Sequence, residues 1–592
     1  MPHIDNLKGA CGSWSAASAP SGSRTTGLRS MHCSMWTLHP RLMGVPLDCG
    51  AFLTNISPGI GSNAPSSITY HLGFLALGAV ADEQYKSRPD LSPPRLNITI
   101  PATEDVGAGY IFVCPYSGFT KGNGFDGPEQ PAGYIFRNDG DLVWSSMGFL
   151  TGWVGNMQVS TWKGQPVISA FQGSLDSFHG HGFGHPTILN QNYENIRDLH
   201  GGNHKIISIH EFNILDSGSA LVEVYQPTQI DLSPYGGVQG ATWIVDAIFQ
   251  EIDLETGKLL FEWSSLQHVS PSQLHLSLGL LYFHINSVDK DSQGNYLISA
   301  HHASALYKVN GKTGQIMSKL GGQDSSFTYP EDLTFGFQHD ARFAKKSSSG
   351  GDVEFVSLFD NAARANGHRG GGVEIVHSKS RAKVIRLDTS NWTASIELSL
   401  ASPDKLLAPS QGNVQTLPND NIFVNWGQGG AVTEYRASDG EAIFHAYLDS
   451  GEIGEGVQSY RGFRFPWNGF PKETPSIVSL VDASGLTTIY VSWNGDTETT
   501  KWQFYAVPAS CVSPLKWFCK PRLLGEAKRA GFETSFTVKD QSFSSRSQPL
   551  LIYAEAFDAR GHHLVSTERV LEQEPGKAKD VVVPNLVAQS EL

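Results

Sequence analysis

The chain has 592 residues and a formal net charge of −14 at pH 7, and charged residues make up only 17% of it. This length exceeds what one ordinary hydrophobic core accommodates, so we expect one large repeat domain and a smaller second domain. The negative charge disfavours nucleic acids and anionic membrane surfaces as partners. Because glycine is frequent and no long helical periodicity occurs, the composition predicts an all-β fold.

Residues 1–94 predict a leader rather than a domain. Residues 1–66 are rich in Ser, Gly, Pro and Ala and carry no strand period, which indicates disorder or a gene start placed too far upstream. The apolar run 72–81 ends in an Ala-x-Ala pattern and resembles a secretory signal with its cleavage site. It is too short to span a bilayer. We therefore expect a secreted protein that is cleaved near Ala81 and whose natural start lies just upstream of Leu72.

Short β-type runs separated by turns follow the leader. Four turns place a polar residue shortly before a glycine and lead directly into an apolar strand; their glycines are Gly140, Gly257, Gly314 and Gly440. The step from Gly257 to Gly314 is about half of the steps on either side, so two turns are missing, and they fit near residues 192–195 and 388–391. A repeat of roughly 60 residues suits a four-stranded blade. The pattern predicts a six-bladed β-propeller over residues 95–470, with an array of β-sandwiches as the alternative.

One blade is clearest in residues 284–343. Runs of apolar and β-branched residues separated by turns rich in Asn and Gly begin at His284, Tyr296, Ala305 and Gln315, which is typical of an antiparallel meander. A propeller gathers loops from every blade around one axis. We therefore expect a functional site at the axis rather than within a blade.

The pattern changes after Trp467. Longer strand-like runs and a Trp493 that is predicted to be buried favour a fibronectin III-like or immunoglobulin-like β-sandwich over residues 474–571, followed by a disordered tail, 572–592. Cys511 and Cys519 lie close enough in sequence to form a small disulfide in a secreted protein. Secretion also opens two sequons to glycosylation, at Asn97 and Asn391.

Histidines occupy the ends of four predicted strands. The patterns are His210-Glu211, His284-Ile285-Asn286, His301-His302 and Gln338-His339-Asp340. Gathered at one axis, imidazoles can bind an anion, transfer protons or attack an electrophile. The alternative for each is a hydrogen-bonded structural histidine, and we take His302 to be structural. The His and Cys spacings predict no metal site, and we expect no cofactor.

Several short motifs occur in the order found in the arylsulfotransferase (ASST) family, and the chain most resembles the fungal secreted branch. The motifs are His284-x-Asn286, Ser299-Ala300-His301-His302, Gly321-Gly322, Gln338-His339-Asp340, Phe359-Asp360-Asn361, Ser410-Gln411-Gly412-Asn413, Val424-Asn425-Trp426-Gly427 and Phe463-Arg464-Phe465-Pro466-Trp467. The resemblance covers residues 95–470. It implies a six-bladed propeller and PAPS-independent transfer of a sulfuryl group from an aryl sulfate to a phenol.

The resemblance also implies roles for individual residues. His339 is the histidine that becomes transiently sulfated, and His210 and His284 are its catalytic partners. Asn286, His301 and Asn361 are the substrate-binding candidates. His301 stands where the family carries an arginine, so a titratable ring replaces a permanent, forked cation. This exchange predicts weaker sulfate binding, or binding that falls as the pH rises past the pKa of His301.

A mechanism follows from these roles. Neutral His339 attacks sulfur, a protonated neighbouring histidine neutralises the leaving phenolate, and a second phenol then takes the sulfuryl group in a ping-pong reaction. His210, His284 and Asn286 are the expected donors to the sulfuryl oxygens. Two alternatives stay open: a cyclisation or pericyclic reaction of a secondary metabolite at the same site, and a non-catalytic secreted propeller that binds glycans or proteins.

Overall fold

The computed structural model describes most of the chain after the leader. The described residues are 82–118, 127–176, 180–235, 243–271, 282–344, 351–365, 373–448, 457–512, 520–539 and 548–573. The signal-like run 72–81 and Cys519 lie outside them, as does the side chain of Cys511. The predictions of a leader, of secretion and of a disulfide are therefore untested.

Strands form almost all of the described structure. The only α-helix in these ranges is α1 (Ser265–His268), and the remaining helical turns are short 3₁₀ segments: Gly202–His204, Ser233–Tyr235, Glu331–Leu333, Gly427–Gly429 and Ala509–Val512. None of the described helices has the length and hydropathy that a membrane crossing requires. The predicted all-β class is confirmed.

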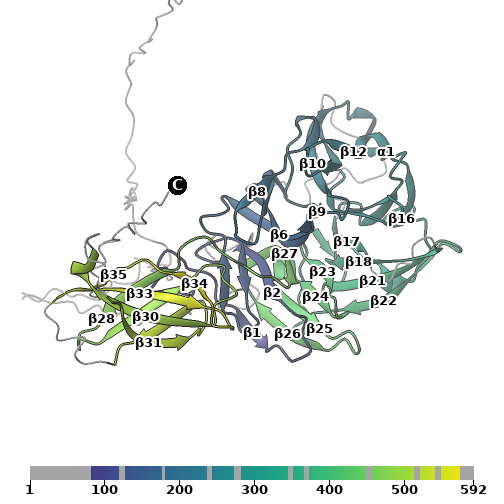
Figure 1. Ribbon diagram of the computed structural model, residues 1–592. Coiled ribbons are helices and arrows are strands. Elements are labelled where there is room, and N and C mark those ends of the chain that lie inside the picture. Colours follow the sequence, from purple (N-terminus) through teal and green to yellow (C-terminus); the bar gives the residue numbers. More distant parts are fainter. Residues whose placement is uncertain are drawn as a thin grey trace, which may run out of the picture. The chain divides into compact units, whose positions relative to one another are not determined.

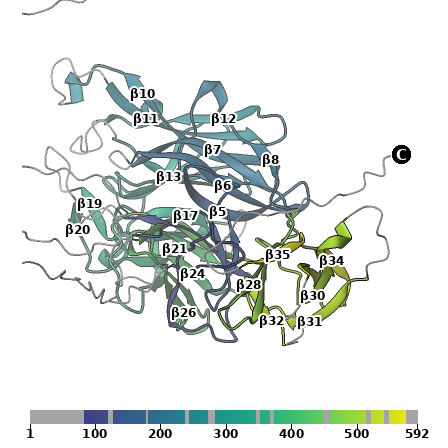
Figure 2. The same ribbon diagram turned by 90° about the vertical axis from the view of Figure 1, so that its left-hand side faces the viewer.

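Six antiparallel sheets form the blades of a propeller, as predicted. From the axis outward, blade 1 contains β27 (Val457–Phe465), β2 (Tyr110–Ser117), β3 (Tyr134–Phe136) and β4 (Leu142–Ser145). Blade 2 contains β5 (Trp153–Trp162), β6 (Gln165–Asp176), β7 (His181–Leu189) and β8 (Asn195–Asp198), which run side by side in Figure 2. Blade 3 contains β9 (Phe212–Ile214), β10 (Ser219–Gln229), β11 (Trp243–Asp253) and β12 (Leu259–Ser264).

The second half of the ring has the same plan. Blade 4 contains β13 (Ile285–Lys290), β14 (Tyr296–Ala300), β15 (Ala305–Val309) and β16 (Ile316–Gly321). Blade 5 contains β17 (His339–Phe343), β18 (Val353–Asp360), β21 (Arg381–Asp388) and β22 (Thr393–Leu400), with an added hairpin of β19 (Ala363–Ala365) and β20 (Val373–Ile375). Blade 6 contains β23 (Asn413–Thr416), β24 (Ile422–Asn425), β25 (Ala431–Tyr435), β26 (Ala442–Tyr447) and, outermost, β1 (Asn97–Ile100).

Both ends of the propeller segment close the ring. The last strand, β27, pairs with the early strand β2, and in Figure 1 the green β27 lies near the purple β2. The first strand, β1, pairs with β26 at the outer edge of blade 6. Closure therefore joins segments some 350 positions apart and protects strand edges that would otherwise be free to pair with another chain.

The turns that predicted the blade period all lie between the third and fourth strands of a blade. Gly140, Gly257, Gly314 and Gly440 have φ angles of 86°, 72°, 72° and 72°, a left-handed conformation that favours glycine. The two turns placed near residues 192–195 and 388–391 lie between β7 and β8 and between β21 and β22. The sequence period therefore marks the outer edge of each blade.

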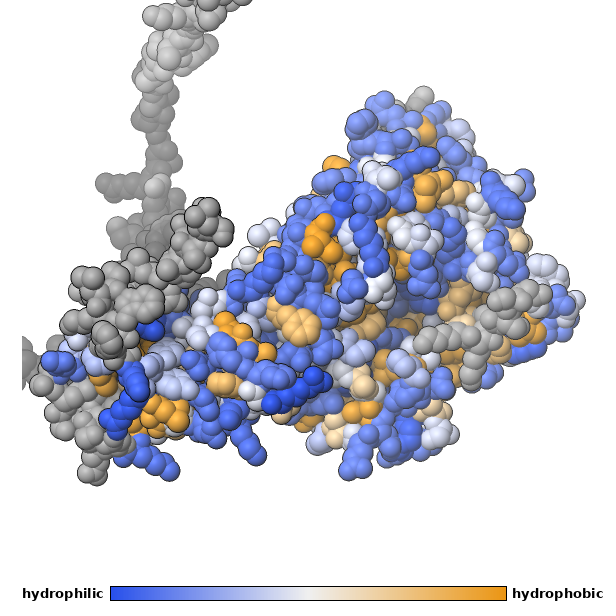
Figure 3. All heavy atoms as spheres, viewed as in Figure 1, coloured by the Kyte–Doolittle hydropathy of each residue, from blue (hydrophilic) through white to orange (hydrophobic). Residues whose placement is uncertain are grey.

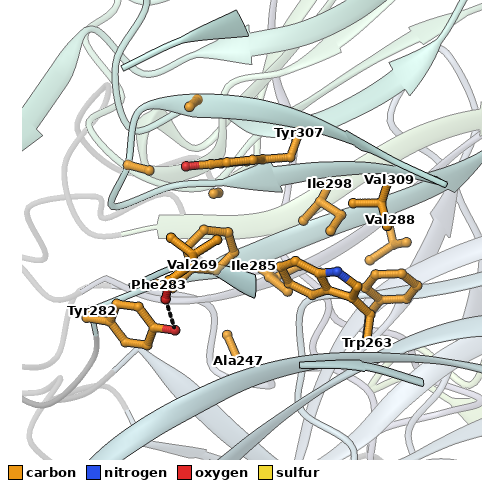
Figure 4. Packing of buried hydrophobic residues seen from close by; sticks show 14 of the residues in the cluster. Ala247, Trp263, Val269, Tyr282, Phe283, Ile285, Val288, Ile298, Tyr307 and Val309 are labelled. Carbon is orange, nitrogen blue, oxygen red and sulfur yellow. Dashed lines mark hydrogen bonds between the residues drawn. The ribbon is translucent and has the colours of Figure 1, made fainter. Parts of the chain in front are cut away.

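Large aromatic side chains fill the interfaces between blades. Figure 4 shows the cluster between blades 3 and 4, in which Trp263 of β12 faces Ile298, Val288 and Val309 of blade 4. The indole Nε1 of Trp263 donates a hydrogen bond to the carbonyl oxygen of Gly314 at 3.0 Å. Burial of each such side chain contributes about 1.5–3 kcal/mol, so these interfaces hold neighbouring blades in register.

The C-terminal domain is one mixed sheet. Its strands are β28 (Ser476–Val481), β29 (Thr487–Ser492), β30 (Lys501–Pro508), β31 (Arg522–Lys528), β32 (Glu533–Thr537), β33 (Leu550–Phe557), β34 (His563–Ser566) and β35 (Val570–Gln573). They pair in the order β31-β30-β33-β35-β28-β29-β32, with β34 beside β33, and the edge strands β31 and β32 contact each other. The sheet is thus nearly closed like a barrel, and the predicted fibronectin III or immunoglobulin identity is unconfirmed. β35 also runs two residues past the predicted boundary at 571.

On the face shown in Figure 3, hydrophobic residues are interspersed among hydrophilic ones. Exposed large hydrophobic side chains, such as Trp243 and Leu523, belong to different domains of the chain. The cluster of predicted site histidines is instead buried, at the propeller axis.

Candidate active site at the propeller axis

Three of the predicted histidines stand at the starts of innermost strands, and His301 follows the end of β14, where Ala300 pairs with Ile285 of β13. His210 lies two residues before β9, His284 directly precedes β13, and His339 begins β17. Hydrogen bonds link Asn286 to Gln338 and Asp289 to Phe343, so β13 and β17 run side by side in the same direction. Strands that share a direction around an axis place their first residues at the same end of it. The blade topology thus gathers histidines that are far apart in sequence.

The strands β13 and β17 each have an irregular pairing register close to the site. The register of β13 against β14 shifts between Ile285 and Ser287, and that of β17 against β18 shifts between His339 and Arg342. Such bulges bend a strand and re-aim its side chains, and they are frequent next to active sites. Asp340 within the second bulge has a φ of 53°, an uncommon conformation for a residue other than glycine.

The imidazole rings form a continuous row. Ring centroids are 4.5 Å apart for His210 and His284, 5.1 Å for His284 and His301, and 5.0 Å for His301 and His339. His302, which we took to be structural, joins the row, because its ring lies 5.0 Å from those of both His284 and His301. The structure thus brings all four predicted histidines together and adds a fifth that the sequence analysis set aside.

Asn361 fixes the tautomer of His339. The Asn361 amide nitrogen donates to the carbonyl oxygens of Ala408 at 2.7 Å and Gln411 at 2.8 Å, so its Oδ1 faces His339. His339 Nδ1 lies 2.7 Å from that Oδ1 and 3.0 Å from the carbonyl oxygen of Phe337. Both of these atoms accept hydrogen bonds, so Nδ1 carries the hydrogen. Nε2 is left with its lone pair, and the N–H of Gln411 donates to it at 3.3 Å.

Burial keeps the histidines neutral. Burial is the largest cause that lowers the pKa of His210 and that of His339 to about 3, and the positive charge of Arg461 acts in the same direction. The pKa values of His284 and His301 are also well below the ordinary value, first because of burial and then because of neighbouring histidines. His301 is therefore uncharged over the neutral range, and any titration of its sulfate binding lies in acid rather than near pH 6.5.

Two residues expected to bind substrate are already engaged. The amide nitrogen of Asn286 donates to the carbonyl oxygen of Gln338 at 2.7 Å, and only its buried Oδ1 is left without a partner among the described residues. The bond to Gln338 uses one of the two N–H hydrogens of Asn286, so its role as a donor to sulfuryl oxygens stays a prediction. Asn361 uses both N–H hydrogens on the two carbonyl groups and its Oδ1 on His339. Asn361 therefore positions the site and has no free donor.

Arg461 on β27 is a residue that the sequence analysis missed. One guanidinium nitrogen, Nη1, lies 3.2 Å from both Asn156 Oδ1 and Glu211 Oε1. The other, Nη2, donates to the carbonyl oxygen of Asn286 at 2.8 Å and lies 3.4 Å from Asp340 Oδ1. Arg461 thus ties together elements of blades 1 to 5 beneath the histidines. Two arginines three residues apart, each next to an aromatic residue, were the available signal.

Two further donors near His339 were also missed. The hydroxyl of Tyr460 is buried and has no hydrogen-bond partner within the described ranges, and its ring lies 6.1 Å from that of His339 and 5.5 Å from that of His210. Gln411 places its N–H against His339 Nε2 from a left-handed conformation, with a φ of 64°. Gln411 belongs to the motif Ser410-Gln411-Gly412-Asn413, for which the sequence indicated no role. No three His, Cys, Asp or Glu side chains in the described ranges are grouped so as to hold a metal ion.

The fold and the site together define a six-bladed β-propeller with a buried cluster of neutral histidines on its axis. Residues 158–448 match the model of the Arylsulfotransferase (ASST) family. The matched segment contains the histidine row and Asn361, whereas Tyr460 and Arg461 on the closing strand lie outside it.

Solved structures show only distant likeness. A protein of unknown function from Bacteroides caccae is 12% identical, with a TM-score of 0.33 over 60% of this chain and 100% of that one. The GH43 protein BlXynB from Bacillus licheniformis is 10% identical, with a TM-score of 0.26 over 71% of this chain and 90% of that one. The PQQ-bound aldose sugar dehydrogenase from Streptomyces coelicolor is 10% identical, with a TM-score of 0.18 over 48% of this chain and 80% of that one. Curated proteins yield no match.

Proposed function

We propose that the protein is a PAPS-independent aryl sulfotransferase that moves a sulfuryl group from an aryl sulfate to a phenolic acceptor through a sulfated His339. The observation that carries this proposal is the fixed tautomer of His339. Its imidazole is neutral, and the hydrogen bond of Nδ1–H to Asn361 leaves the lone pair on Nε2, at the opposite side of the ring. A nucleophilic imidazole must be unprotonated at the attacking nitrogen. The family match at residues 158–448 supports the same chemistry.

The reaction has two half-steps. His339 Nε2 attacks the sulfur of the donor, the sulfur–oxygen bond to the aryl group breaks, and the phenolate leaves with a proton from the histidine row. The phenolic acceptor then loses its proton to the same row and attacks the sulfur, which breaks the nitrogen–sulfur bond and restores neutral His339. Through both steps the hydrogen stays on Nδ1 and its hydrogen bond to Asn361 Oδ1 is kept. This hydrogen bond stabilises the positive charge on the sulfated ring.

Fixed donors near His339 suit the sulfuryl oxygens. The N–H of Gln411 lies 3.3 Å from Nε2, and the hydroxyl of Tyr460, whose ring lies 6.1 Å from that of His339, has no hydrogen-bond partner among the described residues. We assign these two groups the role that the sequence analysis gave to His210, His284 and Asn286. One such donor is typically worth about 2.7–4 kcal/mol of barrier.

Trapping the covalent intermediate tests the function. The purified protein is mixed with 35S-labelled 4-nitrophenyl sulfate without acceptor, quenched in base and digested. We expect label on the peptide that contains His339 and release of the label when a phenol is added. Transfer that leaves no labelled protein would contradict the covalent route, and the absence of any transfer with a panel of aryl sulfates would contradict the proposed function.

Asn361 offers a test of the tautomer. Replacement by alanine removes the shorter of the two hydrogen bonds of Nδ1–H and leaves only the carbonyl oxygen of Phe337, at 3.0 Å, so we expect kcat to fall by about 10- to 100-fold, as when other residues that orient a catalytic imidazole are lost. Asn361→Asp keeps an acceptor at the same place and is the matched control. Its carboxylate raises the pKa of His339, so the acid limb of the pH–rate profile should move to higher pH while activity near neutrality is retained. Equal losses in both variants would contradict this role.

One observation favours a second function. His301, at the position where the family carries an arginine, is neutral, and a neutral ring attracts an anionic sulfate less than a guanidinium does. A buried row of neutral imidazoles also suits acid–base catalysis on an uncharged phenolic metabolite, such as a cyclisation without a covalent step. The labelling experiment separates the two, because only the sulfotransferase forms a labelled His339.

A further inference from the structure

Glu223 on β10 is a buried carboxylate that the proposed reaction does not yet use. Its Oε1 accepts hydrogen bonds from the backbone N–H of His210 at 2.8 Å and from His210 Nδ1 at 3.0 Å, and its Oε2 accepts one from the backbone N–H of Glu211 at 2.6 Å. The side chain has no exposed surface. A carboxylate with this many donors is held in one orientation against His210.

The hydrogen positions of two histidines follow from this contact. When Glu223 is ionised it can only accept, so His210 Nδ1 carries a hydrogen and His210 Nε2 is an acceptor. His284 Nε2 lies 3.1 Å from His210 Nε2 and must then be the donor. The lone pair of His284 is consequently on Nδ1, a buried atom without a hydrogen-bond partner among the described residues.

We propose that Glu223, His210 and His284 form a proton relay whose working end is His284 Nδ1 and whose store is the Glu223 carboxyl group. In the base form, Glu223 is ionised and His284 Nδ1 is free to accept a proton. In the acid form, each proton has moved by one hydrogen bond, so Glu223 is protonated, His210 carries its hydrogen on Nε2 and His284 carries its hydrogen on Nδ1. Both rings are neutral in both forms.

Two features of the surroundings fit such a relay. Burial raises the pKa of Glu223 to about 7 against the opposing effect of its backbone donors, so the carboxyl group can hold or release a proton near neutral pH. The pKa values of His210 and His284 are strongly lowered, so neither ring competes for the proton as a cation. The titratable and charged groups that face the relay are Arg461, Glu211, Tyr460, Tyr225, His181, His301, His302 and His339.

The relay rests on the proposed function and completes its proton balance. In the first half-step the acid form gives the His284 Nδ1 proton to the leaving phenolate oxygen and becomes the base form. In the second half-step the base form takes the proton of the acceptor phenol at His284 Nδ1, and the relay returns to the acid form. No proton leaves the site over a full cycle.

Donors with different leaving groups test the relay through Glu223→Gln. An acid matters little for 4-nitrophenolate, a weak base, and much for phenolate. We expect single-turnover sulfation of His339 to slow by about 10²-fold or more with phenyl sulfate, and by less than about tenfold with 4-nitrophenyl sulfate. Glu251→Gln, which removes a buried carboxylate from the neighbouring strand β11, is the matched control and should slow neither donor.

The pH dependence gives a second readout that a structural role would not produce. Sulfation of His339 by phenyl sulfate needs the acid form, so its rate should fall as pH rises through about 7. Transfer from sulfated His339 to a phenol needs the base form, so its rate should rise over the same range. Both dependences should vanish in Glu223→Gln. Equal slowing with both donors and an unchanged pH profile would overturn the relay and leave Glu223 a purely structural residue.

Spectroscopy on the resting protein separates failure of the relay from failure of the proposed function. We expect a carboxyl infrared band that titrates near pH 7 and is absent in Glu223→Gln. In 15N NMR spectra, the hydrogen of His284 should move from Nε2 to Nδ1 over the same range, without a cationic ring. A Glu223 carboxyl group that titrates at the ordinary value of a glutamate would overturn the relay, whether or not the protein transfers sulfate.

Discussion

Replacement of His339 by alanine is expected to lower kcat/KM for sulfuryl transfer by about 10⁴- to 10⁶-fold, the range found when a covalent nucleophile is removed from other enzymes. The reason is geometric as well as chemical. No other histidine of the row has its reactive nitrogen set by a fixed amide and placed against the backbone N–H of Gln411. Steady-state assays with 4-nitrophenyl sulfate and a phenol measure the effect.

The site left by His339→Ala also allows chemical rescue. The buried Asn361 Oδ1 loses its donor in this variant, and added imidazole can supply both the missing N–H and an attacking nitrogen. We expect imidazole to restore part of the activity in a concentration-dependent way. His445, which is equally buried but lies in blade 6 with Thr433 and Asp404 as partners, provides the control, and His445→Gln should keep near-normal kcat. If His339→Ala retained more than about a tenth of the activity, His339 would not be the nucleophile.

Local signals were enough to predict the propeller. The turn glycines recur because the third and fourth strands of each blade need a left-handed residue at nearly the same place, and this need is local in sequence. The ring closure was not predicted, because pairing of β27 with β2 and of β1 with β26 depends on the whole ring and leaves no local pattern. The predicted fibronectin III-like or immunoglobulin-like sandwich rested on strand lengths and on the burial of Trp493, and neither determines how strands pair.

The histidine row was predictable for a similar reason. Each candidate stands beside the start or end of a strand, in blades 3, 4 and 5, and propeller symmetry carries such positions to one axis. Hydrogen-bond partners were not predictable in this way. The sequence does not show that the amide of Asn286 donates to the carbonyl oxygen of Gln338. Nor does it show that the ring of His302, the residue after His301, joins the row. Glu223 gives no signal at all, because a glutamate in a predicted strand is usually on a solvated face.

The buried arginine helps to hold strained backbone at Asp340. Phe337 and Asp340, on either side of His339, both adopt left-handed φ angles, as does Ala362 after Asn361. Each such residue costs on the order of 1–3 kcal/mol, and it persists only where surrounding contacts determine it. Arg461 contacts Asp340 directly and, through Glu211, is linked to Arg342. The N–H groups of Phe337 and Ala362 are held instead by Ser304 and Asp360.

The second large effect is therefore expected at Arg461. Replacement by methionine removes the charge but keeps most of the volume, and it leaves Glu211 and Asp340 with Arg342 as their remaining cation. Breaking a buried ion pair from one side typically costs about 3–5 kcal/mol. We expect the free energy of unfolding, measured by urea titration, to fall by about that amount, and the double variant Arg461→Met with Glu211→Gln to recover part of the loss.

A matched variant separates stability from catalysis. Arg464 lies three residues along the same strand, is equally buried and pairs with Glu434 at 2.7 Å in blade 6, away from the histidines. Arg464→Met should therefore lose similar stability. Only Arg461→Met should also change the chemistry, because the charge of Arg461 helps to lower the pKa values of His210 and His339. Those pKa values should rise in its absence, which moves the acid limb of the pH–rate profile to higher pH. If the two variants had the same pH–rate profile, Arg461 would be a structural tie between blades, and the neutrality of the histidines would rest on burial alone.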